Sequence, residues 1–456
     1  MPVNRRSIIA ATLGLGAAAT VAKAAQSQDK KSLRQAFQQV AHDIVPALQP
    51  NAAHDQTSIL QAIIDDAAAK DIPVVLPSGV LRVSDLRLRA GTRLIGQARS
   101  TVLEFAGGAA FVTADKADGL VLRGVVFDGA FKAFEEGRGE GLVTISRSAG
   151  IRVDDVEIRN SARSGLQVIA SSGRITSSDV RDALDAGIKS LDATGLEIRG
   201  NTVASCGNSG IQVWRSEQGE DGTIVSGNRI TNIRHAAGGT GEYGNGINVF
   251  RAGSVLVQGN RISDCAYSAI RGNAASNIQI LANSCERLGE VAIYSEFGFE
   301  GALIANNLVD HAATGISVTN FKEGGRLAVI QGNLIRNLFR REQEKTDKRG
   351  EGIGVEADAV ISGNTIEGAP TVGIQIGWGP FMRDVSATGN VIRRSRVGIS
   401  ITSARDAGAC LIANNLISET KDGAIRNMVF GVVTGPDLAR EPGASGRVTV
   451  VGNVAV

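Results

Sequence analysis

Short apolar runs separated by turn residues recur along most of the chain. The clearest pattern is Gly-Asn-x-apolar, with close variants, whose asparagines follow one another at intervals of 23 to 38 residues. Between its copies lies a second motif, a small residue followed by apolar residues at alternate positions, as in SGIQV, VAIYS and TGISV. A third apolar run, such as VLVQ or LEIR, completes each period, and the pattern predicts three half-buried β-strands in each repeat of a solenoid. The repeated asparagines are Asn201, Asn228, Asn260, Asn283, Asn307, Asn333, Asn364, Asn390, Asn415 and Asn453.

The repeat predicts an all-β fold, a parallel β-helix of about twelve three-strand coils in one elongated domain. Each coil buries its apolar positions against the neighbouring coils, because a coil of such short strands cannot bury that face alone. The repeated asparagine is expected to adopt a left-handed φ at its turn and to stack its side-chain amide on the next coil's amide. Its role is therefore structural, and none of these asparagines is a candidate for catalysis.

The chain is expected to begin with a removable leader and a helical cap. In the cap region the apolar spacing predicts an amphipathic helix over 57–70 and a second helix over 32–45. A helix there covers the open apolar end of the coil stack, and the segment 430–445 is expected to shield the opposite end. The expected parts are a signal peptide over 1–24, the helical cap region over 25–80 and the β-helix repeat domain over 81–456.

The leader carries the features of an export signal. Arg5 and Arg6 precede an apolar stretch over 8–22, and Ala22-Lys23-Ala24 fits a small-x-small cleavage site. The stretch is too short to span a membrane, and its mild hydrophobicity resembles that of a twin-arginine signal. An ordinary secretory signal that carries two arginines is the alternative. The mature protein is expected in the periplasm or secreted, without a membrane span, with the twin-arginine export machinery as a partner.

Composition narrows the partners and cofactors. The formal net charge of +2 over 456 residues predicts no basic surface for nucleic acid, which is not expected as a partner. The four cysteines lack CxxC or Cys/His spacing, so we expect neither a zinc site nor a disulfide framework. No strand carries a dense aspartate cluster of the kind that binds calcium, so calcium is unsupported and no cofactor is expected. We expect a monomer.

The chain resembles the pectate-lyase-like right-handed β-helix superfamily, and more narrowly its twin-arginine-exported bacterial repeat proteins. The resemblance lies in the leader, in the predicted helix before VVLPSGVLRV and in the coils that carry Gly-Asn and Gly-Ile. The resemblance implies a right-handed helix and a protein that cleaves, epimerises or binds acidic or acetylated polysaccharides. The catalytic residues of polygalacturonase-like members are mostly missing. Ser164 and Leu184 stand where two of their aspartates would be, Asn208-Ser209 replaces their histidine, and only Asp185 is kept. Inverting hydrolysis needs two carboxylates, so we reject that mechanism.

One face of the predicted helix carries the candidate site. Side chains alternate across a strand, so the second motif points polar and aromatic residues outward on a single sheet. Two inserted loops, 19 residues from Asn228 to Ile247 and 20 from Asn333 to Ile353, are expected to wall a glycan-binding groove. The alternative is an ordinary solvated strand face. The candidate substrate-binding residues are Gln212, Trp214, Asn248, Phe250, Asn273 and Thr319, so that the groove is centred on the coils from Gln212 to Thr319.

Within this groove the strand register predicts that Arg271 lies beside Tyr294 and that Asn273 lies beside Glu296. Arg271, Tyr294 and Glu296 are the candidate catalytic residues, because arginine pairs with the carboxylate of an acidic sugar while tyrosine or glutamate transfers a proton if its pKa is shifted. The expected function is that of an exported polysaccharide-processing lyase, epimerase or hydrolase. The alternative is a non-catalytic glycan-binding or structural protein of the cell envelope.

Overall fold

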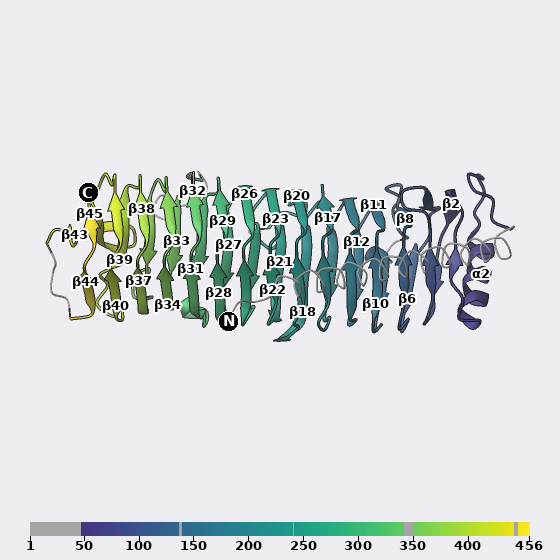
Figure 1. Cartoon of the computed structure of the whole chain (residues 1–456), viewed down its shortest axis with the longest axis horizontal. Coiled ribbons are helices and arrows are strands. Elements are labelled where there is room, and N and C mark those ends of the chain that lie inside the picture. Colours follow the sequence, from purple (N-terminus) through teal and green to yellow (C-terminus); the bar gives the residue numbers. More distant parts are fainter. Residues whose placement is uncertain (1–46, 136–138, 240, 342–349, 442–445) are drawn as a thin grey trace, which may run out of the picture.

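The computed structural model describes residues 47–135, 139–239, 241–341, 350–441 and 446–456, and it shows a long parallel β-solenoid (Figure 1). Strands pair mostly with the third strand before and after them, so that three 15-stranded sheets run along the rod. Sheet A runs from β1 (Val74–Val75) to β44 (Val448–Val451), and sheet B from β2 (Gly79–Val83) to β45 (Val454–Ala455). Sheet C carries the candidate site, and its strands are β3 (Leu86–Leu88), β6 (Val112–Asp115), β9 (Gly141–Ser146), β12 (Ser164–Ile169), β15 (Ala186–Leu191), β18 (Ser209–Glu220), β21 (Asn245–Gly253), β24 (Ile270–Asn273), β27 (Val291–Glu296), β30 (Thr314–Val318), β33 (Glu351–Val355), β36 (Val372–Ile376), β39 (Val397–Thr402), β42 (Ile425–Val429) and β43 (Val432–Asp437).

The parallel β-helix predicted from the repeat is confirmed, but it contains more coils than the predicted number of about twelve, since each sheet holds 15 strands. The additional coils lie at the N-terminal end, where β4 (Arg93–Ile95) and β5 (Thr101–Phe105) pair in register with the strands on either side. These coils lack the asparagine motif. Their interior is filled by large side chains such as Phe105 and Phe111, whose ring centroids lie 5.3 Å apart. Because these coils are packed differently, the repeat motif does not reveal them.

Helix α2 (Thr57–Ala69) covers the N-terminal end of the rod, as the amphipathic pattern predicts (Figure 1). Its buried residues are Leu60, Ile64 and Ala67, spaced along one helical face. At the opposite end β43 pairs antiparallel with β42. No helix in the described part of the chain is long and apolar enough to cross a membrane. The signal peptide over 1–24 and the second predicted helix over 32–45 lie outside the described residues.

The core is built from columns of identical residue type. On sheet C, isoleucines face one another in register on successive strands, because the small-apolar-x-apolar motif returns at the same point of each coil. Each member of this column is fully buried. Stacked β-branched side chains fill the interior without gaps, and this close packing fixes the register of the polar residues between them. The column contains Ile188, Ile211, Ile247, Ile270, Ile293, Ile316, Ile353, Ile374, Ile399 and Ile425.

A buried amide ladder follows the same axis. The Asn283 Nδ2 donates to Asn307 Oδ1 at 3.0 Å and to the Val257 carbonyl at 3.1 Å, and the backbone N–H of Asn283 donates to the same Asn307 oxygen. This pattern repeats from Asn201 to Asn453, so the predicted amide stack is confirmed. The prediction of a left-handed φ at the asparagine is wrong, because the positive φ falls on the preceding residue, such as Gly259 at +64°. Glycine adopts this φ without strain and precedes seven of the ten asparagines, while Ala282, Asn306 and Asn414 adopt it before the other three.

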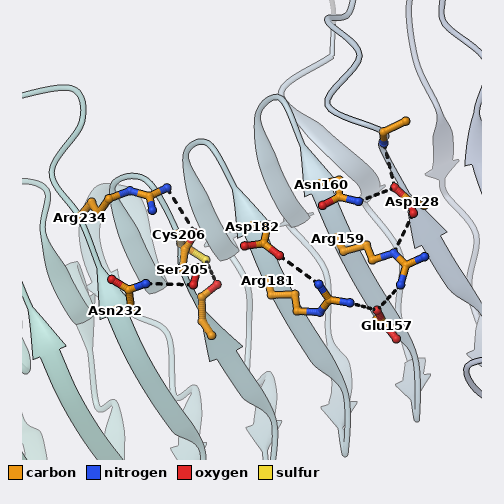
Figure 2. A network of polar contacts seen from close by, with 12 residues as sticks. Asp128, Glu157, Arg159, Asn160, Arg181, Asp182, Ser205, Cys206, Asn232 and Arg234 are labelled. Carbon is orange, nitrogen blue, oxygen red and sulfur yellow. Dashed lines mark hydrogen bonds and ion pairs between the residues drawn. The ribbon is translucent and has the colours of Figure 1, made fainter.

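The outer face of sheet B carries charged side chains that pair across coils (Figure 2). Arg159 lies between Asp128 and Glu157, with N–O distances of 2.7 and 2.9 Å, and Arg181 shares Glu157. These residues lie on β8 (Val126–Asp128), β11 (Glu157–Ser161) and β14 (Asp179–Ala183). Partly exposed pairs of this kind contribute little net stability, so we assign this ladder to strand pairing rather than to a functional site.

Candidate active site

The strands of sheet C bring the predicted quartet together. The register places Arg271 of β24 opposite Tyr294 of β27, and Asn273 opposite Glu296, so the predicted neighbour relations are confirmed. The polar side chains of these rows stand on the outer face because the intervening residues, such as Ile270 and Ile293, are fixed in the core.

Glu296 is held in a buried ion pair. The Arg271 Nε donates to Glu296 Oε1 at 2.6 Å, and Asn273 Nδ2 donates to the same oxygen at 3.1 Å. Only 2% of Glu296 is exposed. Burial raises the pKa of the Glu296 carboxyl above its ordinary value, and the neighbouring Arg271 charge opposes that rise. Glu296 therefore orients Arg271 and does not itself face a ligand.

Arg271 lies against two carboxylates of the protein, although its Nη1 makes no hydrogen bond among the described residues. Its Nη1 lies 3.6 Å from a carboxylate oxygen of Glu290, in addition to the contacts with Glu296. The guanidinium also stacks over the Tyr294 ring at 5.0 Å from the centroid. With two carboxylates already in contact, Arg271 is not placed to form the bidentate pair with an acidic sugar that the sequence suggested.

A cleft of about 210 Å³ opens beside this quartet on the outer face of β27, β30, β33 and β36. It contains hydroxyl, amide, carboxylate and indole groups, the mixture that orients a polar ligand with ring faces. One wall comes from the second inserted loop, whose Arg341 lies 3.3 Å from Glu290. At another margin Glu356 accepts a hydrogen bond of 2.7 Å from the backbone N–H of Phe321, in the short helix Phe321–Glu323. The polar and aromatic lining residues are Glu290, Tyr294, Thr314, Ser317, Thr319, Asn320, Arg341, Glu351, Glu356, Gln375 and Trp378.

Tyr294 is the titratable group of this cleft whose protonation state is best defined. Burial, reinforced by the negative charge of Glu296, raises the pKa of the Tyr294 hydroxyl to about 12. The phenol is therefore protonated at neutral pH and can donate a hydrogen bond, while the raised pKa makes it a weaker acid than an exposed tyrosine. Among the described residues, no group of three or more His, Cys, Asp or Glu side chains is arranged to hold a metal ion.

Comparison with known sequences decides the family. Two stretches, residues 140–324 and 218–382, match the family described as "right handed beta helix region", and together they cover more than half of the chain. The chain belongs to this right-handed β-helix family. The handedness implied by the resemblance is thus confirmed. No curated protein matches the chain by sequence.

Solved structures resemble this β-helix protein at low identity. The pre-mature gene product 12 of bacteriophage phi29 has a TM-score of 0.54 and 14% identity, over 94% of this chain and 58% of the phage protein. The catalytic unit of the α-1,3-glucanase of Streptomyces thermodiastaticus has a TM-score of 0.49 and 16% identity, over 90% and 67% of the two chains. The A-module of the Azotobacter vinelandii mannuronan C-5 epimerase AlgE4 has a TM-score of 0.36 and 16% identity, over 91% and 94%. This chain spans less than two thirds of the phage protein, and at 14% identity its similarity to that protein shows only the fold.

The other predicted binding residues of the β-helix protein divide between the cleft and an earlier cluster. Thr319 lines the cleft with Tyr294, and Asn273 lies beside it in the quartet. Trp214 and Phe250, on β18 and β21, pack edge to face at 5.9 Å, and the Trp214 indole N–H donates to Asn248 Oδ1 at 2.8 Å. Gln212 is 1% exposed and donates to Ser209. The cleft thus lies further along the solenoid than the predicted centre of the groove.

Several cleft residues were missed by the sequence analysis. Glu351 opens the motif EGIGV, where most copies have a small or hydroxyl residue, and this departure was a readable signal. Glu290 and Gln375 occupy ordinary polar positions of their coils, so nothing in the sequence sets them apart. Arg341 belongs to the second inserted loop. The length of that loop predicted that it borders the groove, but nothing in the sequence indicated which of its charged residues lines the cleft.

Both inserted loops meet at Tyr267. The Tyr267 hydroxyl donates to the Gly239 carbonyl at 3.1 Å, and the His235 ring lies 5.0 Å from the tyrosine ring, so the first loop is fixed there. Arg341 of the second loop stacks on the same ring at 5.6 Å. The two insertions predicted to wall a groove therefore make contact with one side chain on the coils between them.

We expect Gly241→Ala to disturb the Arg271 position. Gly241 has a φ of +124°, and a Cβ there would lie 1.6 Å from Arg271 Nη1. Gly238, in the same loop, has a φ of +78° and nothing within 4 Å of its Cβ position, so Gly238→Ala is a matched control for backbone strain. Gly241→Ala should lower the free energy of unfolding by about 2 kcal/mol more than Gly238→Ala. Equal losses of unfolding free energy in urea would show that a side chain at position 241 does not displace Arg271.

Proposed function

We propose that this β-helix protein binds an extended glycan in the cleft of sheet C and processes it by acid–base chemistry, as a lyase, epimerase or hydrolase. The observation that carries the proposal is the position of Tyr294, a phenol in a cleft that also contains the carboxylates of Glu351 and Glu356. A positioned acid and a positioned base together supply the proton transfers of such reactions. Glu351 is the first residue of β33 and Glu356 directly follows its last residue, so the two are about 16 Å apart along the strand.

The shape of the site supports a long ligand. The cleft extends over four successive strands, from β27 to β36, which is about 14 Å at the spacing of neighbouring strands. Trp378 offers a ring face, and the hydroxyl and amide groups of Thr319, Asn320 and Gln375 offer hydrogen bonds. The proposal rests on these residues of the cleft.

A non-catalytic glycan-binding function is the second candidate. It is favoured by the burial of the Arg271–Glu296 pair, because two of the three predicted catalytic side chains are engaged with each other. In this function Tyr294 acts as a hydrogen-bond donor to the bound sugar. For both functions we propose export by the twin-arginine leader, which carries Arg5 and Arg6, to the periplasm or beyond.

Tyr294→Phe tests the proposal. The purified protein is incubated with a panel of acidic and neutral polysaccharides, and new reducing ends, unsaturated uronate absorbance and calorimetric binding are recorded. On a polysaccharide that is turned over, Tyr294→Phe should lower kcat by about 100-fold or more with little change in thermal stability. Tyr243→Phe removes a hydroxyl outside the cleft lining and is the matched control, with kcat within about twofold of the parent.

The outcomes separate the two candidates. Unchanged kcat in Tyr294→Phe contradicts its role as the acid. Binding without turnover on every polysaccharide, weakened by Tyr294→Phe, establishes the glycan-binding function in place of catalysis. If the protein neither binds nor turns over any polysaccharide of the panel, the assignment of this cleft to glycans is overturned.

A further inference from the structure

A second hollow lies outside the cleft, on turns that lead from sheet B to sheet C. Its volume is about 590 Å³, and residues of four successive coils line it. The hollow therefore extends for about 14 Å along the rod, from the turn before β33 to the turn before β42. Its charged and hydroxyl residues are Arg340, Arg394, Ser395, Arg396, Glu419 and Lys421.

The lining is strongly positive, with four cations and one carboxylate. Arg394 pairs with Glu367, and Arg396 Nε lies 3.5 Å from Asp422. Arg340 donates to the Pro370 carbonyl at 3.0 Å. Within the described part of the chain, neither Arg340 nor Lys421 forms an ion pair with a carboxylate. Four cations from three coils are thus gathered around one space, and two of them, Arg340 and Lys421, have no carboxylate partner among the described residues.

One donor at this hollow also lacks an acceptor. The Nε of Arg396 is buried and makes no hydrogen bond within the described residues, since its approach to Asp422 is an ion pair at 3.5 Å. A buried donor without an acceptor costs about 1–3 kcal/mol. A bound anion would supply an oxygen acceptor to this group.

We propose that this hollow is a binding site for a phosphate or sulfate group. A tetrahedral oxyanion presents several oxygens in different directions, so it can accept from Arg396 and Lys421 on adjacent turns at once. The group is either a free ion or an ester on a polymer, and both share this chemistry. The site stands apart from the proposed glycan cleft, although Arg340 of the hollow and Arg341 of the cleft wall are neighbours in the chain.

The experiment uses the mature protein with four probes: inorganic phosphate, inorganic sulfate, dextran sulfate and uncharged dextran. Binding is measured by calorimetry at low and high salt. The double variant Arg396→Gln/Lys421→Gln is compared with Lys116→Gln/Arg123→Gln, which removes the same charge from distant exposed positions. The double variant should weaken anion binding by about tenfold or more, and the distant variant by less than about twofold.

Each outcome decides the proposal. Binding of both inorganic ions that the double variant weakens supports a site for the free ion. Binding of dextran sulfate alone, weakened in the same way, supports an ester on a polymer. The proposal is overturned if no anionic probe binds, if uncharged dextran binds as tightly as dextran sulfate, or if the distant variant weakens binding as much as the double variant. Turnover at the cleft is a separate readout, so failure here leaves the proposed function intact.

Discussion

Asn307→Ala is expected to lower the free energy of unfolding by about 3–5 kcal/mol. The Asn307 Nδ2 donates to the Ile280 carbonyl at 2.9 Å and to Asn333 Oδ1 at 3.0 Å. Its Oδ1 accepts from the backbone N–H of Asn283 at 2.9 Å and from the Asn283 Nδ2 at 3.0 Å. Truncation therefore removes four buried hydrogen bonds and leaves their partners unsatisfied, and this is the costly way to lose a hydrogen bond.

Asn453→Ala is the matched control for this prediction. Asn453 occupies the last position of the ladder, where its contacts are partly exposed and water replaces the lost partners. Its loss should cost less than about 1.5 kcal/mol. Urea unfolding followed by far-ultraviolet circular dichroism measures both variants. Similar losses of unfolding free energy at the two positions, or a loss below about 1 kcal/mol at Asn307, would contradict the prediction that the buried amide ladder stabilises the fold.

Arg271→Met is expected to lower the free energy of unfolding by about 3–5 kcal/mol at pH 8, because it leaves the Glu296 carboxylate buried without its partner. Methionine keeps much of the side-chain volume, so the effect reports the lost charge rather than a cavity. The cleft should also lose affinity for its ligand, since the guanidinium supports the Tyr294 ring from one side.

The loss in Arg271→Met should depend on pH in a defined direction. The folded state already raises the pKa of Glu296 through burial, and removing Arg271 takes away the charge that opposes the rise. An acid whose pKa is higher in the folded state than in the unfolded state binds its proton more tightly when folded. The folded state is therefore relatively most stable below the unfolded pKa, and this advantage is lost as the pH rises through the folded pKa. The destabilisation should be smaller at pH 5 than at pH 8.

Arg287→Met provides the comparison for an exposed pair. The Arg287 side chain is 53% exposed and pairs with Asp264 at 2.7 Å. Its replacement should cost less than about 1 kcal/mol, because water screens the pair. Thermal and urea unfolding of both variants between pH 5 and pH 8 measure the difference. A loss in Arg271→Met that stays constant across this range would contradict an uncompensated buried carboxylate at Glu296.

The sequence predicted the parts of the site that follow from the repeat. The motif fixes Ile270 and Ile293 at the same point of successive coils, so Arg271 and Tyr294 must be neighbours on the outer face, as the register confirms. It did not predict that Glu296 is almost fully buried, because burial depends on Arg271 and Asn273 of the preceding coil as well as on the strand itself. Alternation gives the face on which a side chain stands, and neighbouring side chains decide how much of it water reaches.

By itself the sequence determined the parallel β-helix, the helix at its N-terminal end, the amide stack and the register of sheet C. The coils, the amide stack and the register repeat at a regular period, and they are enforced locally by alternating apolar residues and by the asparagines from Asn201 to Asn453. The helix follows from its own amphipathic pattern. Only the tertiary structure decided where the cleft opens, that Arg341 and Glu351 line it, and that Tyr267 joins both inserted loops. Those features depend on contacts between segments of irregular length on different coils, and no periodic pattern encodes such contacts.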